Sequence, residues 1–111
     1  MKKIEAVIRS NKLDQVEKAL SNLGISGITV SQVLGWGRQK GNITEVYRGT
    51  EVFVRLLSKV KLEIIVNDPE SESVQETIRE NALTGKFGDG VIWVTDVEDF
   101  RRIRTGENFL D

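Results

Sequence analysis

Three short segments of the sequence combine glycines with cationic side chains. They are residues 35–41 (GWGRQKG), 84–90 (TGKFGDG) and 101–107 (RRIRTGE). Glycines let backbone N–H groups approach an anion closely, and arginine and lysine side chains add charged donors. If the fold brings the segments together, or if a neighbouring chain supplies the arginines, they form a site for a nucleotide diphosphate or triphosphate. The sequence pattern does not decide between these two geometries.

Neither glycine-rich segment matches a standard nucleotide-binding motif. Residues 35–41 have the spacing G-x-G-x-x-x-G, and residues 42–45 do not begin an amphipathic helix, which excludes a Rossmann dinucleotide site. Residues 84–90 lack the Gly-Lys-Ser/Thr order of a P-loop, and a tight connection between a helix and a strand is the alternative there. Arg102 and Arg104 would share one side of an extended chain and suit a polyphosphate, although surface pairs of this kind are often simply solvated.

Other candidate contacts have structural alternatives. Lys59 and Glu63 lie on one face of a predicted strand, where they form either an ion pair along the strand or a ligand contact. Tyr47 is either a contact or modification residue, or it packs within its own loop. No pair of carboxylates can be assigned as an acid–base couple, because the sequence gives no reason for a shifted pKa.

The elements that must position these segments follow from the spacing of the apolar residues. Alternating residues predict strands, and apolar residues at helical spacing after Ser, Asn or Asp predict two helices. The order β-α-β-β-α-β predicts an α+β, ferredoxin-like sandwich with both helices on one face of an antiparallel sheet. The predicted strands are residues 3–9, 27–34, 57–66 and 91–94. The first predicted helix ends at Gly24. The second begins at Asp68 and Pro69, with Asp68 as the capping carboxylate, and carries Val74, Ile78 and Ala82 on one face.

The connection of residues 35–56 breaks this pattern. It is too long for a hairpin, contains four glycines and lacks a strong apolar period. Long insertions without structure in a compact domain are usually functional or disordered. Trp36, Tyr47 and Phe53 are large side chains that a linker has little reason to carry. We therefore expect a functional loop, with a merely mobile insertion as the alternative.

The composition excludes several classes of protein. With 111 residues the chain forms one domain, and the absence of cysteine and histidine excludes disulfides, thiol or imidazole catalysis, and metals held by either residue. We therefore do not expect an enzyme. The formal net charge of −1 does not indicate a protein that binds nucleic acids, which would have an excess of basic residues. No stretch approaches the length of about 18 apolar residues that a membrane span requires, so we expect a cytoplasmic protein without membrane insertion.

Together with residues 2–6, 47–49 and 59–61, the three segments resemble the PII nitrogen-regulatory signal-transduction family over nearly all of the 111 positions. The resemblance implies a homotrimer whose three clefts between subunits bind ATP or ADP, with 2-oxoglutarate chelating a magnesium ion beside ATP. It also implies that a long loop between the second and third strands, the T-loop, docks on a regulated target. The implied single domain, residues 1–111, contains the T-loop (about 36–56), a glycine-rich B-loop (about 83–91) and a C-terminal basic loop (about 101–111).

The resemblance also assigns roles to individual positions. Thr29, Glu63 and Ile65 match positions near the adenosine moiety, and Arg102 and Arg104 match arginines that reach phosphates across the subunit boundary. The nucleotide-binding positions that it implies are Val7, Thr29, Gly35, Gly37, Arg38, Glu63, Ile65, Gly88, Asp89, Gly90, Arg102 and Arg104. The 2-oxoglutarate positions are Gln39, Lys40, Gly41 and Lys59, with Gln39 also helping to hold the metal and Lys59 pairing with a carboxylate. The target-binding positions are Tyr47 and Arg48, and Thr50 is a candidate modification site.

Three departures mark a divergent member of the family. The family commonly has a lysine after Gly-Asp-Gly, where this chain has Val91. A charged contact to phosphate contributes about 1.5 to 3 kcal/mol to binding. We therefore expect its loss to shift the preference between ATP and ADP. The T-loop is one residue longer around residues 42–44, and Val52 stands at the usual modifiable tyrosine, so uridylylation or adenylylation is not expected there. Ser10 and Ser58 stand where proline-containing turns are typical.

The function that the resemblance implies is that of a non-enzymatic sensor. It would report ATP and ADP, and 2-oxoglutarate with Mg-ATP, to a membrane transporter (an ammonium channel or another) or to a metabolic enzyme through its T-loop. The alternatives are a sensor with an ADP-biased response and no 2-oxoglutarate sensing, a weak ATPase of the same fold, and a scaffold for another small ligand such as bicarbonate. The set of Arg38, Arg102 and Arg104 favours the nucleotide sensor over the last of these.

Overall fold

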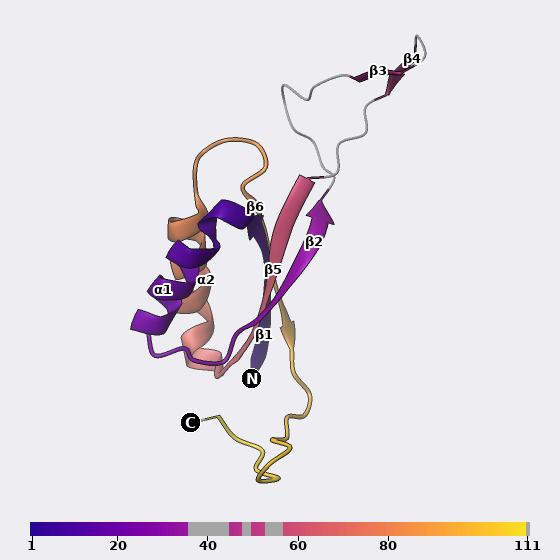
Figure 1. Cartoon of the computed structure of the whole chain (residues 1–111). Coiled ribbons are helices and arrows are strands. Elements are labelled where there is room, and N and C mark those ends of the chain that lie inside the picture. The colour runs from indigo at the N-terminus through magenta and orange to yellow at the C-terminus, as the bar shows by residue number, and fades with distance from the viewer. Residues whose placement is uncertain (36–44, 48–49, 53–56, 111) are drawn as a thin grey trace.

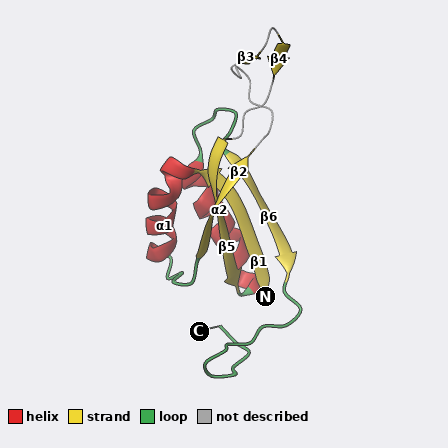
Figure 2. Cartoon of the chain, turned by 45° about the vertical axis from the view of Figure 1, so that its right-hand side comes forward, coloured by secondary structure: helices red, strands yellow, loops and turns green. Residues whose placement is uncertain are grey.

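The computed structural model of the chain describes residues 1–35, 45–47, 50–52 and 57–110. Two helices pack side by side on one face of a sheet (Figures 1 and 2). The sheet has the strand order β2-β5-β1-β6 with every neighbouring pair antiparallel, and a separate two-stranded sheet joins β3 to β4. The elements are β1 (Lys2–Arg9), α1 (Leu13–Asn22), β2 (Thr29–Gly35), β3 (Glu45–Tyr47), β4 (Thr50–Val52), β5 (Leu57–Val66), α2 (Ser71–Ala82) and β6 (Gly90–Asp96), with short 3₁₀ turns at Ser10–Lys12 and Asp68–Glu70.

Each long crossover passes over one strand of the main sheet. Helix α1 connects β1 to β2, which lie on either side of β5, and helix α2 connects β5 to β6, which lie on either side of β1. This split β-α-β arrangement is the ferredoxin-like topology. The predicted α+β fold class is therefore confirmed.

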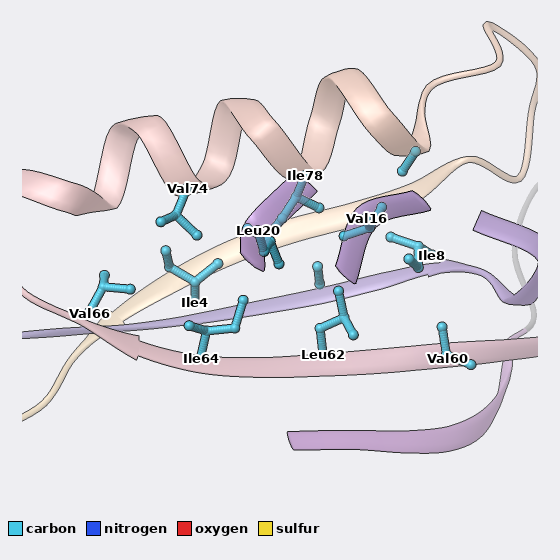
Figure 3. Close-up of a cluster of buried hydrophobic side chains, with 12 residues drawn as sticks. Ile4, Ile8, Val16, Leu20, Val60, Leu62, Ile64, Val66, Val74 and Ile78 are labelled. Carbon is cyan, nitrogen blue, oxygen red and sulfur yellow. The ribbon is translucent and has the colours of Figure 1, made fainter. Parts of the chain in front are cut away.

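The hydrophobic core lies between the helices and the sheet, and it follows from the two periodicities of the sequence. On β1 the core residues are Ile4, Ala6 and Ile8, which alternate with charged residues and the half-buried Val7. Figure 3 shows Ile4 and Ile8 on the side of the sheet that faces the two helices. The remaining buried residues of this cluster are Val60, Leu62, Ile64 and Val66 on β5, Val16 and Leu20 on α1, and Val74, Ile78 and Ala82 on α2.

Neither described helix covers the opposite face of the sheet, and this face carries paired charges. Glu5 is only 9% exposed, because Lys3 and Lys61 approach its two carboxylate oxygens at 2.6 and 3.5 Å. Glu63 lies 3.6 Å from Lys3 and 3.5 Å from Lys61. The Lys61 ammonium also lies 5.5 Å from the centre of the Trp93 ring. Alternation along the strands thus produces one apolar face and one face of linked charges.

The structure corrects two predictions about local contacts. Asp68 does not cap a helix with its side chain; its carboxylate pairs with the N-terminal ammonium at 2.8 Å, and α2 begins at Ser71 after a 3₁₀ turn that contains Pro69. The suggested ion pair between Lys59 and Glu63 is also wrong. Glu63 pairs with Lys3 and Lys61, whereas the Lys59 ammonium donates to the carbonyl of Gly88.

The connection between β2 and β5 contains a small sheet of its own. Strands β3 and β4 pair in antiparallel register, with Glu45 opposite Val52 and Tyr47 opposite Thr50. The sequence did not predict these two strands, because this connection lacks a strong apolar period. In the part of the chain that the structure describes, no helix is long and apolar enough to cross a membrane.

Candidate functional site

The described candidate residues divide between the two ends of the main sheet. Strand β2 runs antiparallel to β5, so Thr29 lies opposite Glu63 at one end and Gly35 lies opposite Leu57 at the other. Strand β6 begins beside Ile8 and ends beside Lys2. The connection from α2 to β6 therefore lies at the Gly35 end, and the segment after β6 leaves from the opposite end (Figure 1).

A pocket lies at the Thr29 end of the sheet. Its volume is about 410 Å³, which is within the usual range for small-molecule sites. Three of the predicted adenosine positions line it, and Arg102 borders the same space. The lining residues are Leu23, Gly24, Ile25, Ser26, Gly27, Thr29, Glu63, Ile65, Glu70, Phe100, Arg102 and Leu110, and we call this cavity the Thr29 pocket.

Arg102 is held at the base of a hydrogen-bonded turn. Its N–H donates to the carbonyl of Glu107 and its carbonyl accepts from the N–H of Gly106, both at 2.8 Å. Gly106 has a φ of +73°, a left-handed conformation that glycine adopts without a steric penalty. The expectation of an extended chain is therefore wrong here: residues 103–105 form a turn, so Arg102 and Arg104 do not share a side by strand alternation.

The guanidinium of Arg102 is incompletely paired. Its carbon lies 5.6 Å from the centre of the Phe100 ring, within the range of a cation–π contact. Its Nε is buried and has no hydrogen-bond partner among the described residues. A buried donor without an acceptor costs about 1 to 3 kcal/mol. The Nε donor of Arg102 is therefore unsatisfied within the described residues.

At the other end of the sheet, the Asp89 carboxylate organises the turn of residues 84–90. Its Oδ2 accepts from the N–H groups of Thr84 and Gly85 at 2.9 and 2.8 Å. Its Oδ1 accepts from Arg9 Nε at 3.2 Å and from the Thr84 hydroxyl. Burial by itself would raise the pKa of this carboxyl, but the hydrogen bonds from Thr84, Gly85 and Arg9 outweigh burial and hold the pKa well below its usual range.

Two cations from the main sheet bind carbonyl groups of the same turn. Arg9 Nη2 donates to the carbonyl of Phe87 at 2.8 Å, and the Lys59 ammonium donates to the carbonyl of Gly88. Lys59 is only 8% exposed. Burial, and then the positive charge of Arg9, lower the pKa of Lys59, although Asp89 opposes the shift. The turn is therefore attached to the ends of both central strands.

Two glycines at this end allow close approaches of the backbone. Gly90 has a φ of +109°, and a Cβ there would lie 1.8 Å from the carbonyl oxygen of Val7. At Gly35 a Cβ would lie 3.0 Å from Cγ of Lys59. Val91, the residue after Gly90, lies opposite Val7 and is 59% exposed.

Comparison with known proteins identifies the family of the chain. A family model described as "Nitrogen regulatory protein P-II" matches residues 1–107. The chain belongs to the P-II family. It is 57% identical to the nitrogen regulatory protein P-II of Pasteurella multocida (strain Pm70) and 54% identical to that of Rhizobium meliloti (strain 1021), over 111 residues in each case. Each alignment covers 100% of this chain and 98% of the relative, so the resemblance inferred from the motifs is confirmed.

Several predicted positions of this P-II chain lie outside the described residues. They are Gly37, Arg38, Gln39, Lys40, Gly41 and Arg48. Tyr47 ends β3 and Thr50 begins β4, opposite each other in the small sheet. The roles predicted for these eight positions stay predictions.

Arg9 is a residue of this candidate site in the P-II chain that the sequence patterns did not indicate. Arg9 ends β1, and the turn that it contacts is about 80 positions further along the sequence. One signal for it was present: Arg9 alternates with Val7 on the uncovered face of β1, and Lys59 lies opposite it on β5. Because β1 pairs with β6, a cation at the end of β1 lies close to the turn that leads into β6.

Proposed function

We propose that this P-II chain is a nucleotide-responsive regulator that binds ADP or ATP in clefts between three copies of itself. Binding redistributes conformations of its T-loop, which acts on a transporter or a metabolic enzyme. The observation that carries the proposal is the Thr29 pocket, where Thr29, Glu63 and Ile65 gather beside the incompletely paired Arg102. The names of the relatives, which are nitrogen regulatory proteins, support regulation as the task.

The separation of the two ends of the sheet supports a site shared between copies. Glu63 and Lys59 are four residues apart on β5, which corresponds to about 13 Å along a strand. A nucleotide lying along β5 would have its base near Glu63 and its phosphates near Lys59 and the turn of residues 84–90. Because Arg102 of the same chain is at the Glu63 end, an arginine from the C-terminal segment reaches those phosphates only from a neighbouring copy.

Lys59 supports an anionic second ligand such as 2-oxoglutarate. Its ammonium has three donors, and within the described residues it has one acceptor, the Gly88 carbonyl. Burial strengthens its attraction to a carboxylate, because little water screens the charge. Within the described residues no group of three or more acidic side chains could hold a metal ion. We therefore assign Mg²⁺ to the nucleotide phosphates and to Gln39 rather than to an acidic cage.

Two solution measurements test the proposal. Light scattering coupled to size exclusion should give a mass three times the 12.5 kDa of one chain. Calorimetric titrations with ADP, with ATP, and with ATP, Mg²⁺ and 2-oxoglutarate together should each show binding, the last one tighter than ATP alone. A monomer that binds none of these ligands would contradict the proposed function. If a trimer binds nucleotides and 2-oxoglutarate has no effect, the proposal of a nucleotide sensor stands and the proposal of 2-oxoglutarate as a second ligand fails.

Val91 favours a response biased towards ADP. Its exposed side chain follows Gly90 at the end of the sheet assigned to the phosphates, and it offers them no charge. The substitution Val91→Lys should tighten ATP binding by about tenfold, since a charged hydrogen bond contributes about 1.5 kcal/mol or more, and should tighten ADP binding less. Equal affinities for ATP in the wild type and in Val91→Lys, measured by calorimetry, would remove the support for this bias.

A further inference from the structure

We propose that Arg9 and Asp89 form a clamp that holds the turn of residues 84–90 in the shape that binds the phosphates, and that the Asp89 carboxylate itself does not contact the ligand. Arg9 is then a positioning residue. The proposal rests on the proposed function, because it takes nucleotide phosphates as the ligand. The shape of the turn can nevertheless be measured without any ligand.

The Asp89 carboxylate is already saturated with donors. An ionised carboxylate offers about four lone-pair sites, and Asp89 uses them for the N–H groups of Thr84 and Gly85, the Thr84 hydroxyl and Arg9 Nε. A ribose hydroxyl that donated to this carboxylate would have to displace one of these bonds. The Asp89 side chain therefore stabilises the turn. The family resemblance places Asp89 in the nucleotide site, and we assign that role to its backbone N–H rather than to its carboxylate.

The carbonyl contacts of the turn fix the direction of its N–H groups. The carbonyl of Phe87 accepts from Arg9, and the carbonyl of Gly88 accepts from Lys59. All peptide bonds described are trans, and in a planar trans peptide the C=O and the following N–H point in opposite directions. The N–H groups of Gly88 and Asp89 therefore point away from the two cations. Two successive outward N–H groups with cations behind them form a concave anion-binding surface.

Gly90 fixes the other end of the turn. Its approach to the Val7 carbonyl leaves no room for a side chain, and β6 begins there. The turn is thus held at three points. At its start, Asp89 accepts from the N–H groups of Thr84 and Gly85. In its middle, Arg9 and Lys59 donate to two carbonyls, and at its end Gly90 packs against β1. Arg9 is the group that connects two of these points, because one guanidinium contacts both Asp89 and Phe87.

The test compares Arg9→Met and Arg9→Lys with the wild type, and uses Lys18→Met, which removes an exposed cation from α1, as the control for charge. Amide exchange of Thr84 and Gly85, followed by NMR in the ligand-free protein, should be about tenfold faster in Arg9→Met and unchanged in Lys18→Met. ADP binding should weaken by about tenfold in Arg9→Met, whereas any binding of adenosine alone should not change.

Arg9→Lys separates position from charge. Lysine keeps the charge but lacks the planar fork that contacts two acceptors at once, so ADP binding should weaken by more than about threefold. ADP affinity equal to that of the wild type in Arg9→Lys would overturn the clamp in favour of simple charge attraction. Equal losses for ADP and adenosine in Arg9→Met would overturn it in favour of general destabilisation. If the wild type binds neither ADP nor ATP, the proposed function fails, and the exchange rates alone decide whether Arg9 shapes the turn.

A second variant tests the role assigned to Asp89. The N–H groups of Thr84 and Gly85 share Oδ2, whereas Arg9 Nε and the Thr84 hydroxyl donate to Oδ1. An asparagine amide has only one oxygen, so its NH₂ group faces donors on one of the two sides, and Asp89→Asn should loosen the turn and accelerate exchange at Thr84 and Gly85 even without ligand. The proposal would be overturned if the ligand-free Asp89→Asn variant had the amide exchange rates of the wild type but bound ADP much more weakly. The carboxylate would then be a direct ligand contact.

Discussion

The two ends of the main sheet differ in how completely their charges are paired. At the turn of residues 84–90, the Asp89 carboxylate accepts from Arg9 and from the backbone, and Arg9 and Lys59 each donate to a backbone carbonyl of the same chain. At the Thr29 pocket, Arg102 has a buried Nε without a partner among the described residues. At the first end the Asp89 carboxylate and the turn are therefore held before any ligand arrives, and we call it the completed end. At the other end a donor of Arg102 has no acceptor among the described residues.

Gly90→Ala should produce the largest loss, because it disrupts the completed end. Its Cβ would lie 1.8 Å from the Val7 carbonyl oxygen, and the φ of +109° is strained for any L-residue. We expect a loss of more than about 3 kcal/mol in the free energy of unfolding, measured by urea denaturation. Gly24→Ala is the matched control: it has a φ of +88° but nothing within 4 Å, and should lose only about 1 kcal/mol from strain. Similar losses in both variants would show that the close approach to β1 is unimportant.

Asp89→Asn should produce an intermediate loss that depends on pH. Near neutral pH we expect about 2 kcal/mol, from the charged hydrogen bonds that are removed. Because the pKa of Asp89 is lower in the folded than in the unfolded chain, the unfolded chain binds its proton first as the pH falls below about 4. Wild-type stability should therefore fall more steeply than that of Asp89→Asn below that pH. Parallel pH profiles from urea denaturation would contradict this account of the completed end.

Arg102→Met should produce the smallest change in stability. The substitution removes a cation–π contact, but it also removes the unpaired Nε, and the two effects offset each other to within about 1 kcal/mol. Arg9→Met, in contrast, should lose about 1 to 2 kcal/mol in the same ligand-free assay, because it removes one of the donors to Asp89 and the donor to the Phe87 carbonyl. If Arg102→Met were the more destabilised variant, the comparison between the two ends would be reversed.

The sequence predicted the fold well, because the main elements depend on short-range patterns. Strand β5 has the predicted bounds, Leu57 and Val66, since its core residues alternate without interruption. Helix α1 stops before Gly24, whose φ of +88° is the left-handed conformation expected at a helix end. Strand β6 is longer than predicted, because Gly90 and Thr95 carry no apolar signal but pair with β1 all the same.

The contacts of the candidate site were predicted less well, because they join residues that are far apart in the sequence. Glycines and arginines indicated an anion site but not that Arg9 would hold the turn of residues 84–90. Asp68 had the position of a capping residue, yet the N-terminal ammonium is close enough to pair with it. Arg102 and Arg104 were expected on one side of an extended chain, whereas the hydrogen bonds around Gly106 close a turn there.

The position of Trp93 beside Lys61, on the face of the sheet without helices, makes this residue a built-in optical probe. Trp93 is 38% exposed, so its surroundings would change if another copy covered that face. Indole fluorescence responds to nearby charge and to water. With Trp36 replaced by phenylalanine, the emission of Trp93 would follow assembly directly during dilution, without an attached label.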